Sequence, residues 1–232
     1  MRVFIAGLGQ AGLNVASHLG ELGHSVTVID RDPTVARRVF EQHGIVALTG
    51  DATSASLLHE AEVEHADVAV AMLARDADNL AVALLARELG ARRVMVRMRD
   101  VHYRGAYELA GVDRILSETE ILVGAVAMAI EHRAVRHAML LGTGDTVAFE
   151  LTIPPEAAVV GRSVSAIATD PGYPRSCVFA GIFDASGMQS PRGATVIAKD
   201  QTVLLVSLRS EMSAVVAFFM RTPSGGTVMP PA

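Results

Sequence analysis

The sequence contains no tryptophan and only one cysteine, Cys177, and aromatic residues make up just 4% of it. A lone cysteine excludes an internal disulfide, and the cysteine and histidines nowhere show the spacing of a metal site. We therefore expect no bound metal and a reducing compartment. The longest apolar run, residues 121–130, is ten residues long, well short of the ~20 that a membrane span needs.

Neither sign of charge dominates the sequence. Twenty Lys and Arg residues stand against 25 Asp and Glu residues, and the formal net charge is −5. Because there is no basic patch to bind phosphates, we expect no nucleic acid partner. The apolar start at residues 3–6 is no signal sequence, since Gly7, Gly9 and Gly12 interrupt it. These features predict a cytoplasmic globular protein of one large or two modest domains.

Up to about residue 137, short apolar runs typical of buried strands alternate with the apolar stripes of helices. The expected strands are 3–6, 26–29, 45–48, 68–72, 94–96 and 114–116. The expected helices are 10–22, 33–42, 54–61, 76–89, 102–110 and 118–137. Strands joined through helices of this length require right-handed crossovers. We therefore predict an α/β fold with a Rossmann-like, doubly wound parallel sheet over residues 1–137.

The pattern changes after this first domain. Glycines and polar residues favour a linker at 138–145. A small α+β C-terminal domain is expected at 146–220. Its expected strands are 146–153, 177–183 and 202–206, separated by turns such as 184–187 and 191–193. Its expected helices are 163–168 and 211–220. The tail, 221–232, is rich in Pro and Gly, and we expect it to be loose.

A glycine motif of the form G-x-G-x-x-G lies between the first expected strand and the first expected helix. Gly7 suits a tight turn, Gly9 lets a pyrophosphate approach the backbone, and Gly12 lets helix and strand pack closely. The helix N-terminus then presents amides to the phosphates. Asp30 ends the second strand, where a carboxylate can accept both ribose hydroxyls of an adenosine. Because it would also repel a 2′-phosphate, NADP is disfavoured even with Arg31 beside it.

Further contacts are expected at the carboxyl ends of strands three to five, where open α/β sheets bind ligands. Residues 50–53, 76–79 and 97–100 lie there. Arg97 ends a buried strand and needs an anionic partner, for which a phosphate is one candidate. Asp76 or Asp78 is equally suited to capping the following helix, and Arg99 to lying in solvent.

These motifs occur in an order that resembles the RCK (regulator of K⁺ conductance) or TrkA family. The resemblance covers about residues 1–220. In the N-terminal part it rests on residues 7–12, 28–30, 50–53, 78–80 and 97–103. In the C-terminal part, which is similar to the TrkA C-terminal domain, it rests on residues 160–164, 190–196 and 199–206. Lys199 stands where that family usually has glycine.

The resemblance implies a cytosolic gating subunit of a K⁺ transporter or channel, held at the inner face of the membrane by that partner. In the branch that senses ATP and ADP, the fourth residue of the glycine motif is an arginine. Here it is Gln10, as in the branch that binds NAD(H). We therefore rank NAD(H) first and ATP/ADP second. The predicted cofactor-binding residues are Gly7, Gly9, Gln10, Ala11, Gly12, Asp30, Arg31, Gly50, Asp51, Ala52, Thr53, Asn79 and Arg97.

The resemblance also implies a homodimer that assembles into a ring. We expect the apolar helix at 118–137 to be the dimer element. Glu118 and Glu120 lie near a cation site of some relatives, but neither aligns with it, and no metal is predicted. In some relatives the C-terminal domain holds cyclic di-AMP, for which Arg175 and Arg192 are the candidate cations here. We expect this domain to be chiefly an assembly element.

The alternative function is an NAD-dependent oxidoreductase of a small substrate. Such an enzyme needs a second domain that closes over the nicotinamide and supplies a proton-transfer residue. No histidine follows residue 140, and we predict no catalytic residue. Sustained hydride transfer would favour the enzyme, whereas nucleotide binding without turnover would favour the regulator. A transcription regulator is disfavoured, because no helix-turn-helix segment is evident.

Overall fold

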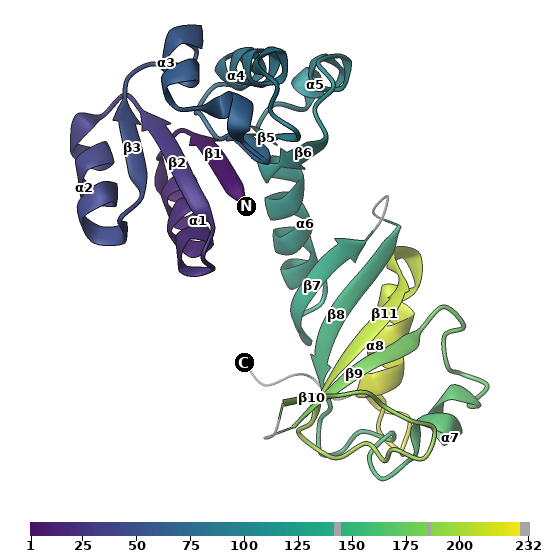
Figure 1. Ribbon diagram of the computed structural model, residues 1–232. Coiled ribbons are helices and arrows are strands. Elements are labelled where there is room, and N and C mark those ends of the chain that lie inside the picture. The colour runs from purple at the N-terminus through teal and green to yellow at the C-terminus, as the bar shows by residue number, and fades with distance from the viewer. Residues whose placement is uncertain (142–144, 185–186, 228–232) are drawn as a thin grey trace. The chain divides into compact units, whose positions relative to one another are not determined.

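The computed structural model describes residues 1–141, 145–184 and 187–227. The chain divides into two compact units, Met1–Glu120 and Ile121–Ala232 (Figure 1). Parts of the expected linker (142–144), of an expected turn (185–186) and of the expected loose tail (228–232) lie outside the described residues. Across the described ranges, no helix is both long and apolar enough to cross a membrane.

The first unit is built on a parallel sheet of six strands in the order β3-β2-β1-β4-β5-β6. The strands are β1 (Arg2–Ala6), β2 (Ser25–Asp30), β3 (Val46–Thr49), β4 (Val68–Ala71), β5 (Val94–Met98) and β6 (Arg114–Ser117). This is the Rossmann-like, doubly wound order, and it confirms the predicted fold class. The strand order reverses between β1 and β4, and ligands of such sheets bind at this switch point.

Helices connect these strands, and the expected helices of this unit are present. They are α1 (Gln10–Glu21), α2 (Pro33–His43), α3 (Ala55–Glu60), α4 (Asp76–Leu89) and α5 (Arg104–Leu109), with short 3₁₀ turns η1 (Val63–His65) and η2 (Val101–Tyr103). Local sequence sets their ends. Asp32 caps α2 by accepting from the Thr34 N–H, Pro33 takes the first position, and Gly44 ends the helix in the left-handed region.

The side chains along each strand point alternately to the two faces of the sheet, and an apolar core lies on each face. In β1, Val3 and Ile5 pack with residues of α1 and α2, whereas Phe4 and Ala6 pack with residues of α3, α4 and α5. Because successive side chains of a strand point to opposite faces, one buried strand serves both cores. This explains why the strands of the unit read as continuous apolar runs.

The second unit contains an antiparallel sheet in the order β10-β9-β11-β8-β7. Its strands are β7 (Val135–Leu141), β8 (Thr146–Thr152), β9 (Val178–Asp184), β10 (Gly187–Gln189) and β11 (Thr202–Leu208). Its helices are α7 (Val164–Ala168), the 3₁₀ turn η3 (Arg209–Glu211) and α8 (Met212–Met220), and α6 (Glu118–Glu131) leads into it. The small α+β domain expected after the parallel sheet is thus present.

Two expectations around residue 137 are wrong. The helix expected at 118–137 ends at Glu131, and residues 135–141 form β7 instead of the end of a helix and the start of a linker. β7 pairs with β8, with Ala138 opposite Phe149. Ala, Met and Leu in this segment favour a helix, but pairing with a neighbouring strand overrides that weak local preference.

Two further segments differ from expectation. Gly187, expected in a turn, begins the short strand β10, which pairs with β9. Residues 221–227, expected to be loose, form a turn. The Thr222 N–H donates to the Gly226 carbonyl at 2.8 Å, and Arg221 bridges to Thr227. In both cases hydrogen bonds with backbone groups a few residues away along the chain give the segment a defined structure.

Cys177 lies in the core of the second unit and is only 5% exposed. Burial raises the pKa of its thiol to about 11, and the negative charge of Glu211 adds to this effect, while a hydrogen bond with Tyr173 opposes it. At pH 8 only about one thiol in a thousand is then the reactive thiolate. We expect Ellman's reagent to modify the native protein at least ~100-fold more slowly than the protein in 6 M guanidinium chloride.

Absorbance of the released thionitrobenzoate measures both rates. A Cys177→Ser variant, which has no thiol, supplies the blank. Equal rates in the native and unfolded protein would contradict the burial of this thiol.

Candidate functional site

The glycine motif forms the turn between β1 and α1, and two of its three glycines are required by the fold. Gly7 has a φ of +97°, and a Cβ there would lie 3.0 Å from the Leu73 Cδ2 atom. Gly12 lies in the first turn of α1, where a Cβ would come within 2.0 Å of the Gly7 carbonyl oxygen. The roles expected for Gly7 in a tight turn and for Gly12 in close packing are therefore confirmed.

Gly9 differs from these two glycines. Its φ of −57° suits any residue. A Cβ on it would have no atom of the described residues within 4 Å. It is the N-cap of α1, and no side chain within the described ranges caps that helix. Gln10 and Ala11, which follow, are exposed. Among the described residues, therefore, no side chain covers the amino end of α1 at Gly9.

Asp30 joins this turn to the end of β2. Its Oδ2 atom accepts a hydrogen bond from the Leu8 N–H at 2.6 Å, and its Oδ1 atom accepts one from the Asp32 N–H at 2.9 Å. Each carboxylate oxygen keeps a second lone pair. Asp30 can therefore hold the glycine turn and still accept hydroxyl groups of a ligand.

The segment after β3 lies beside Asp30. The Gly50 N–H donates to the Asp30 carbonyl at 2.8 Å. The Asp51 carboxylate accepts from the Thr53 N–H and hydroxyl and from Arg31, whose Nη2 atom is 2.7 Å away. The hydrogen bonds from Thr53 lower the pKa of Asp51. Ala52, beside it, is buried. Because Gly50 contacts Asp30 and Asp51 contacts Arg31, residues 50–53 lie at the same edge as the glycine turn.

Asn79 has a structural position that the sequence does not reveal. It is fully buried in α4. Its Oδ1 atom accepts from the Leu73 N–H at 2.7 Å, and its Nδ2 group donates to the carbonyls of Leu73 and Arg97 at 3.1 and 3.0 Å. Both amide protons are thereby used. Asn79 therefore holds the ends of β4 and β5 together, and its predicted contact with a cofactor stays a prediction.

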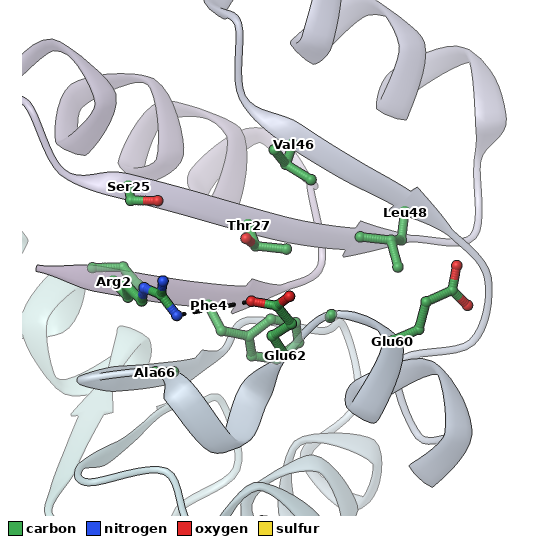
Figure 2. A pocket seen from close by; sticks show the side chains of 11 residues that line it. Arg2, Phe4, Ser25, Thr27, Val46, Leu48, Glu60, Glu62 and Ala66 are labelled. Atoms are coloured by element: carbon green, nitrogen blue, oxygen red, sulfur yellow. Dashed lines mark ion pairs between the residues drawn. The ribbon is translucent and has the colours of Figure 1, made fainter.

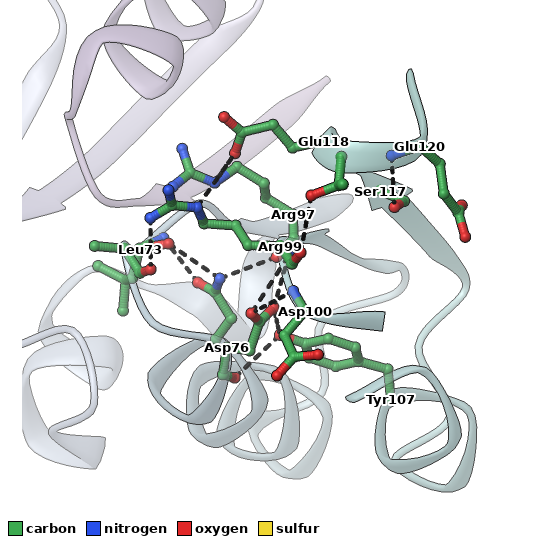
Figure 3. Close-up of polar contacts among 12 residues, drawn as sticks. Leu73, Asp76, Arg97, Arg99, Asp100, Tyr107, Ser117, Glu118 and Glu120 are labelled. Atoms are coloured by element: carbon green, nitrogen blue, oxygen red, sulfur yellow. Dashed lines mark hydrogen bonds and ion pairs between the residues drawn. The ribbon is translucent and has the colours of Figure 1, made fainter. Parts of the chain in front are cut away.

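Asp76 is another buried polar residue at this edge, and it does not cap α4. It accepts hydrogen bonds from the N–H groups of Arg99 and Asp100, and the Tyr107 hydroxyl donates to it at 2.9 Å (Figure 3). Burial, followed by the proximity of Asp76, raises the pKa of Tyr107. The sequence does not single out Tyr107, because a lone tyrosine in a helix carries no local signal.

Arg97 finds its anionic partner within the protein. Its Nε atom lies 3.3 Å from Oε2 of Glu118, and the Nε atom of Arg99 lies 3.7 Å from the same oxygen. Glu120 instead binds Arg104 through both carboxylate oxygens, at 2.8 and 2.7 Å. No group of three or more His, Cys, Asp or Glu residues in the described ranges is arranged to hold a metal ion.

The sequence model of one protein family, the TrkA-N domain, matches residues 3–118, which is half of the chain. The chain belongs to the TrkA-N family. A Trk system potassium uptake protein TrkA homolog of Methanothermobacter thermautotrophicus is 28% identical over 173 residues, covering 75% of this chain and 80% of the relative. The Trk system potassium uptake protein TrkA of Mycobacterium tuberculosis is 32% identical over 168 residues, covering 71% of this chain and 75% of the relative.

Among solved structures, the GsuK channel bound to NAD matches this TrkA-N protein with a TM-score of 0.66. The match covers 96% of this chain and 40% of that one at 20% identity, and shows a shared fold. This chain spans about half the length of several other curated TrkA relatives.

A pocket of about 300 Å³ lies elsewhere in the TrkA-N unit, between the sheet and the segment from α3 to η1 (Figure 2). Thr27 and Val46 line it from the sheet, and an ion pair of 3.8 Å between Arg2 and Glu62 lies beside it. None of the predicted cofactor residues lines this pocket.

Proposed function

We propose that this TrkA-N protein binds a nucleotide across the glycine turn, with NAD(H) as the first candidate and ATP or ADP as the second. The observation that carries the proposal is Gly9. The fold accounts for Gly7 and Gly12 but gives no reason for Gly9, whereas a pyrophosphate lying on the amino end of α1 would exclude any side chain there.

The choice of nucleotide rests on charge. Asp30 would accept ribose hydroxyls through its remaining lone pairs and would repel a 2′-phosphate. Gln10 is neutral and exposed, so it supplies no cation that would favour the γ-phosphate of ATP over ADP. The solved GsuK channel, which has the same fold, is bound to NAD and supports NAD(H) as a candidate.

We propose further that the nucleotide regulates a potassium transporter or channel. The curated relatives are potassium uptake proteins, and the GsuK relative is a channel. The chain would act in the cytoplasm as a regulatory subunit bound to a membrane partner. A nucleotide shifts the equilibrium between two conformations of such a subunit only if it binds one of them more tightly than the other.

A homodimer that builds a larger ring is the assembly we propose for this role. The support is an apolar surface on α6, which would be costly to leave in water. Its exposed residues are Ile121, Leu122, Val123, Val126 and Ile130. The strand β7 adds exposed Met139 and Leu140 in the same compact unit.

For the second unit we propose a role in assembly rather than in sensing. Arg175 and Arg192, the candidate cations for cyclic di-AMP, are both exposed. Tyr173 packs parallel to Phe179 and edge-on to Phe218 within the core of the unit. It is therefore already engaged and is poorly placed to stack on a base.

Calorimetry with NADH, NAD, ATP and ADP tests the nucleotide proposal. We expect Asp30→Ala to weaken NADH binding by about 10- to 100-fold, because each charge-assisted hydrogen bond to the ribose contributes ~1.5–3 kcal/mol before water compensates. Asp32→Ala is the matched control. It removes the same charge two positions away, from a side chain that caps α2, and should leave the affinity unchanged.

Four outcomes would count against this proposal. Failure of all four nucleotides to bind would refute it, and stronger binding of ATP than of NADH would reverse the ranking. Equal affinities of the Asp30→Ala and Asp32→Ala variants would assign Asp30 to the turn alone. Sustained oxidation of NADH with a small substrate would instead support the oxidoreductase.

A further inference from the structure

Glu118 is shared by two arginines at the carboxyl end of β5. Its Oε2 atom lies 3.3 Å from Nε of Arg97 and 3.7 Å from Nε of Arg99. The Arg97 side chain is only 18% exposed, and its Nε atom makes no hydrogen bond that satisfies normal geometry. The ion pair therefore compensates the charge of Arg97 but leaves one of its donors without a well-directed acceptor.

The ion pairs at this place are uneven. Two guanidinium groups face one carboxylate, and in the ranges that the structure describes neither arginine pairs with another acid. Asp76 is buried and engaged by backbone N–H groups and by Tyr107. Glu120 is bound to Arg104. Asp76 and Glu120 keep their negative charges, but neither forms an ion pair with Arg97 or Arg99, so these two guanidinium groups have donors that a further anion could engage.

These two arginines lie next to the proposed nucleotide site. The Nη1 atom of Arg99 donates to the Ala74 carbonyl at 3.3 Å. Leu73, the preceding residue, is the side chain that a Cβ on Gly7 would touch. Figure 3 shows the arginine side chains extending from β5 toward Leu73, with Glu118 lying across them.

We propose that Glu118 is a displaceable anion: it pairs with Arg97 and Arg99 while the site is empty, and an anionic group of the bound nucleotide takes its place. The inference rests on the proposed function. A phosphate can accept several hydrogen bonds from guanidinium groups, including the unsatisfied Nε of Arg97. Glu118 is 49% exposed, and an ion pair this exposed is weak enough to exchange.

The exchange would carry a signal because of where Glu118 lies in the chain. It is the first residue of α6, and the division between the two compact units falls inside that helix, after Glu120. Displacement of Glu118 frees the first turn of α6 from β5. Binding of the anionic ligand would thereby change the contacts at the start of α6, the helix that leads from one unit to the other.

Two isosteric variants of the full chain test the proposal. Glu118→Gln removes the competing charge, and we expect it to tighten NADH binding about three- to tenfold. Glu120→Gln is the matched control, because it removes the same charge from the same helical turn but from the pair with Arg104. Its affinity should stay within about twofold of the unchanged protein.

Hydrogen exchange of the peptide covering residues 117–124 supplies a second measurement. In the unchanged protein NADH should speed exchange there. In Glu118→Gln the exchange should already be fast without ligand and should not rise further. In an Arg97→Gln background, Glu118→Gln should no longer change the affinity, since the competition requires both partners.

The outcomes separate this inference from the proposed function. Failure of NADH to bind the unchanged protein overturns both, and calorimetry on that protein alone reveals it. Normal binding to the unchanged protein with equal affinities of Glu118→Gln and Glu120→Gln overturns only the displacement of Glu118. Weaker binding by Glu118→Gln overturns it as well.

Discussion

Gly9→Ser is expected to weaken nucleotide binding about 10- to 100-fold while leaving the melting temperature unchanged or slightly higher. Serine is a preferred N-cap, so it suits the start of α1. A Cβ at this position meets no described atom within 4 Å, so the fold tolerates it. The same side chain would occupy the space of a pyrophosphate, and a clash of this size costs about 1–3 kcal/mol.

Gly12→Ser is the matched variant with the opposite expectation for stability. Its Cβ would lie 2.0 Å from the Gly7 carbonyl oxygen, so α1 must move away from the turn. We expect the free energy of unfolding to fall by about 1–3 kcal/mol or more, with a melting temperature several degrees lower. Calorimetric titration and thermal unfolding of both variants measure the two effects.

The pair separates a packing glycine from a binding glycine. If Gly9→Ser bound NADH as tightly as the unchanged protein, no ligand would lie against the amino end of α1. If Gly12→Ser were as stable as the unchanged protein, the close approach of α1 to the glycine turn would be wrong.

Leu122→Glu is expected to convert the proposed dimer into monomers. Leu122 is 61% exposed and lies among the apolar residues of α6. In a two-fold interface the substitution places two unpaired carboxylates in an apolar contact, which costs several kcal/mol. Light scattering after gel filtration at micromolar concentration measures the mass. Leu84→Glu, on an exposed leucine of α4, adds the same charge outside α6 and should leave the mass unchanged.

Met128 does not belong to this surface, although the apolar run of the sequence includes it. It is 5% exposed and packs in the core of the second unit. Met128→Glu should therefore unfold that unit rather than dissociate a folded dimer, and circular dichroism distinguishes the two results. The role of α6 would be contradicted if the unchanged protein had the molecular mass of a single chain. It would also be contradicted if a dimer survived Leu122→Glu.

The alternating elements of the first unit were predictable because their signals are local. A buried strand followed by a glycine turn and an amphipathic helix is encoded within about 20 residues. The glycine motif and Asp30 were predictable for the same reason, since each is recognised from its position at the end of a neighbouring strand. The sequence by itself therefore determined the doubly wound sheet and the edge at which its candidate site lies.

The tertiary structure alone decided what depends on a distant partner. Residues 135–141 became a strand because β8 offers a pairing edge, although their composition favours a helix. Arg97 required an anion by its burial, but only the fold selected Glu118, 21 positions along the chain, as that anion. Asp76 and Tyr107 meet across 31 positions. Such pairings depend on which side chains the folded strands and helices bring together, and the local sequence does not specify those contacts.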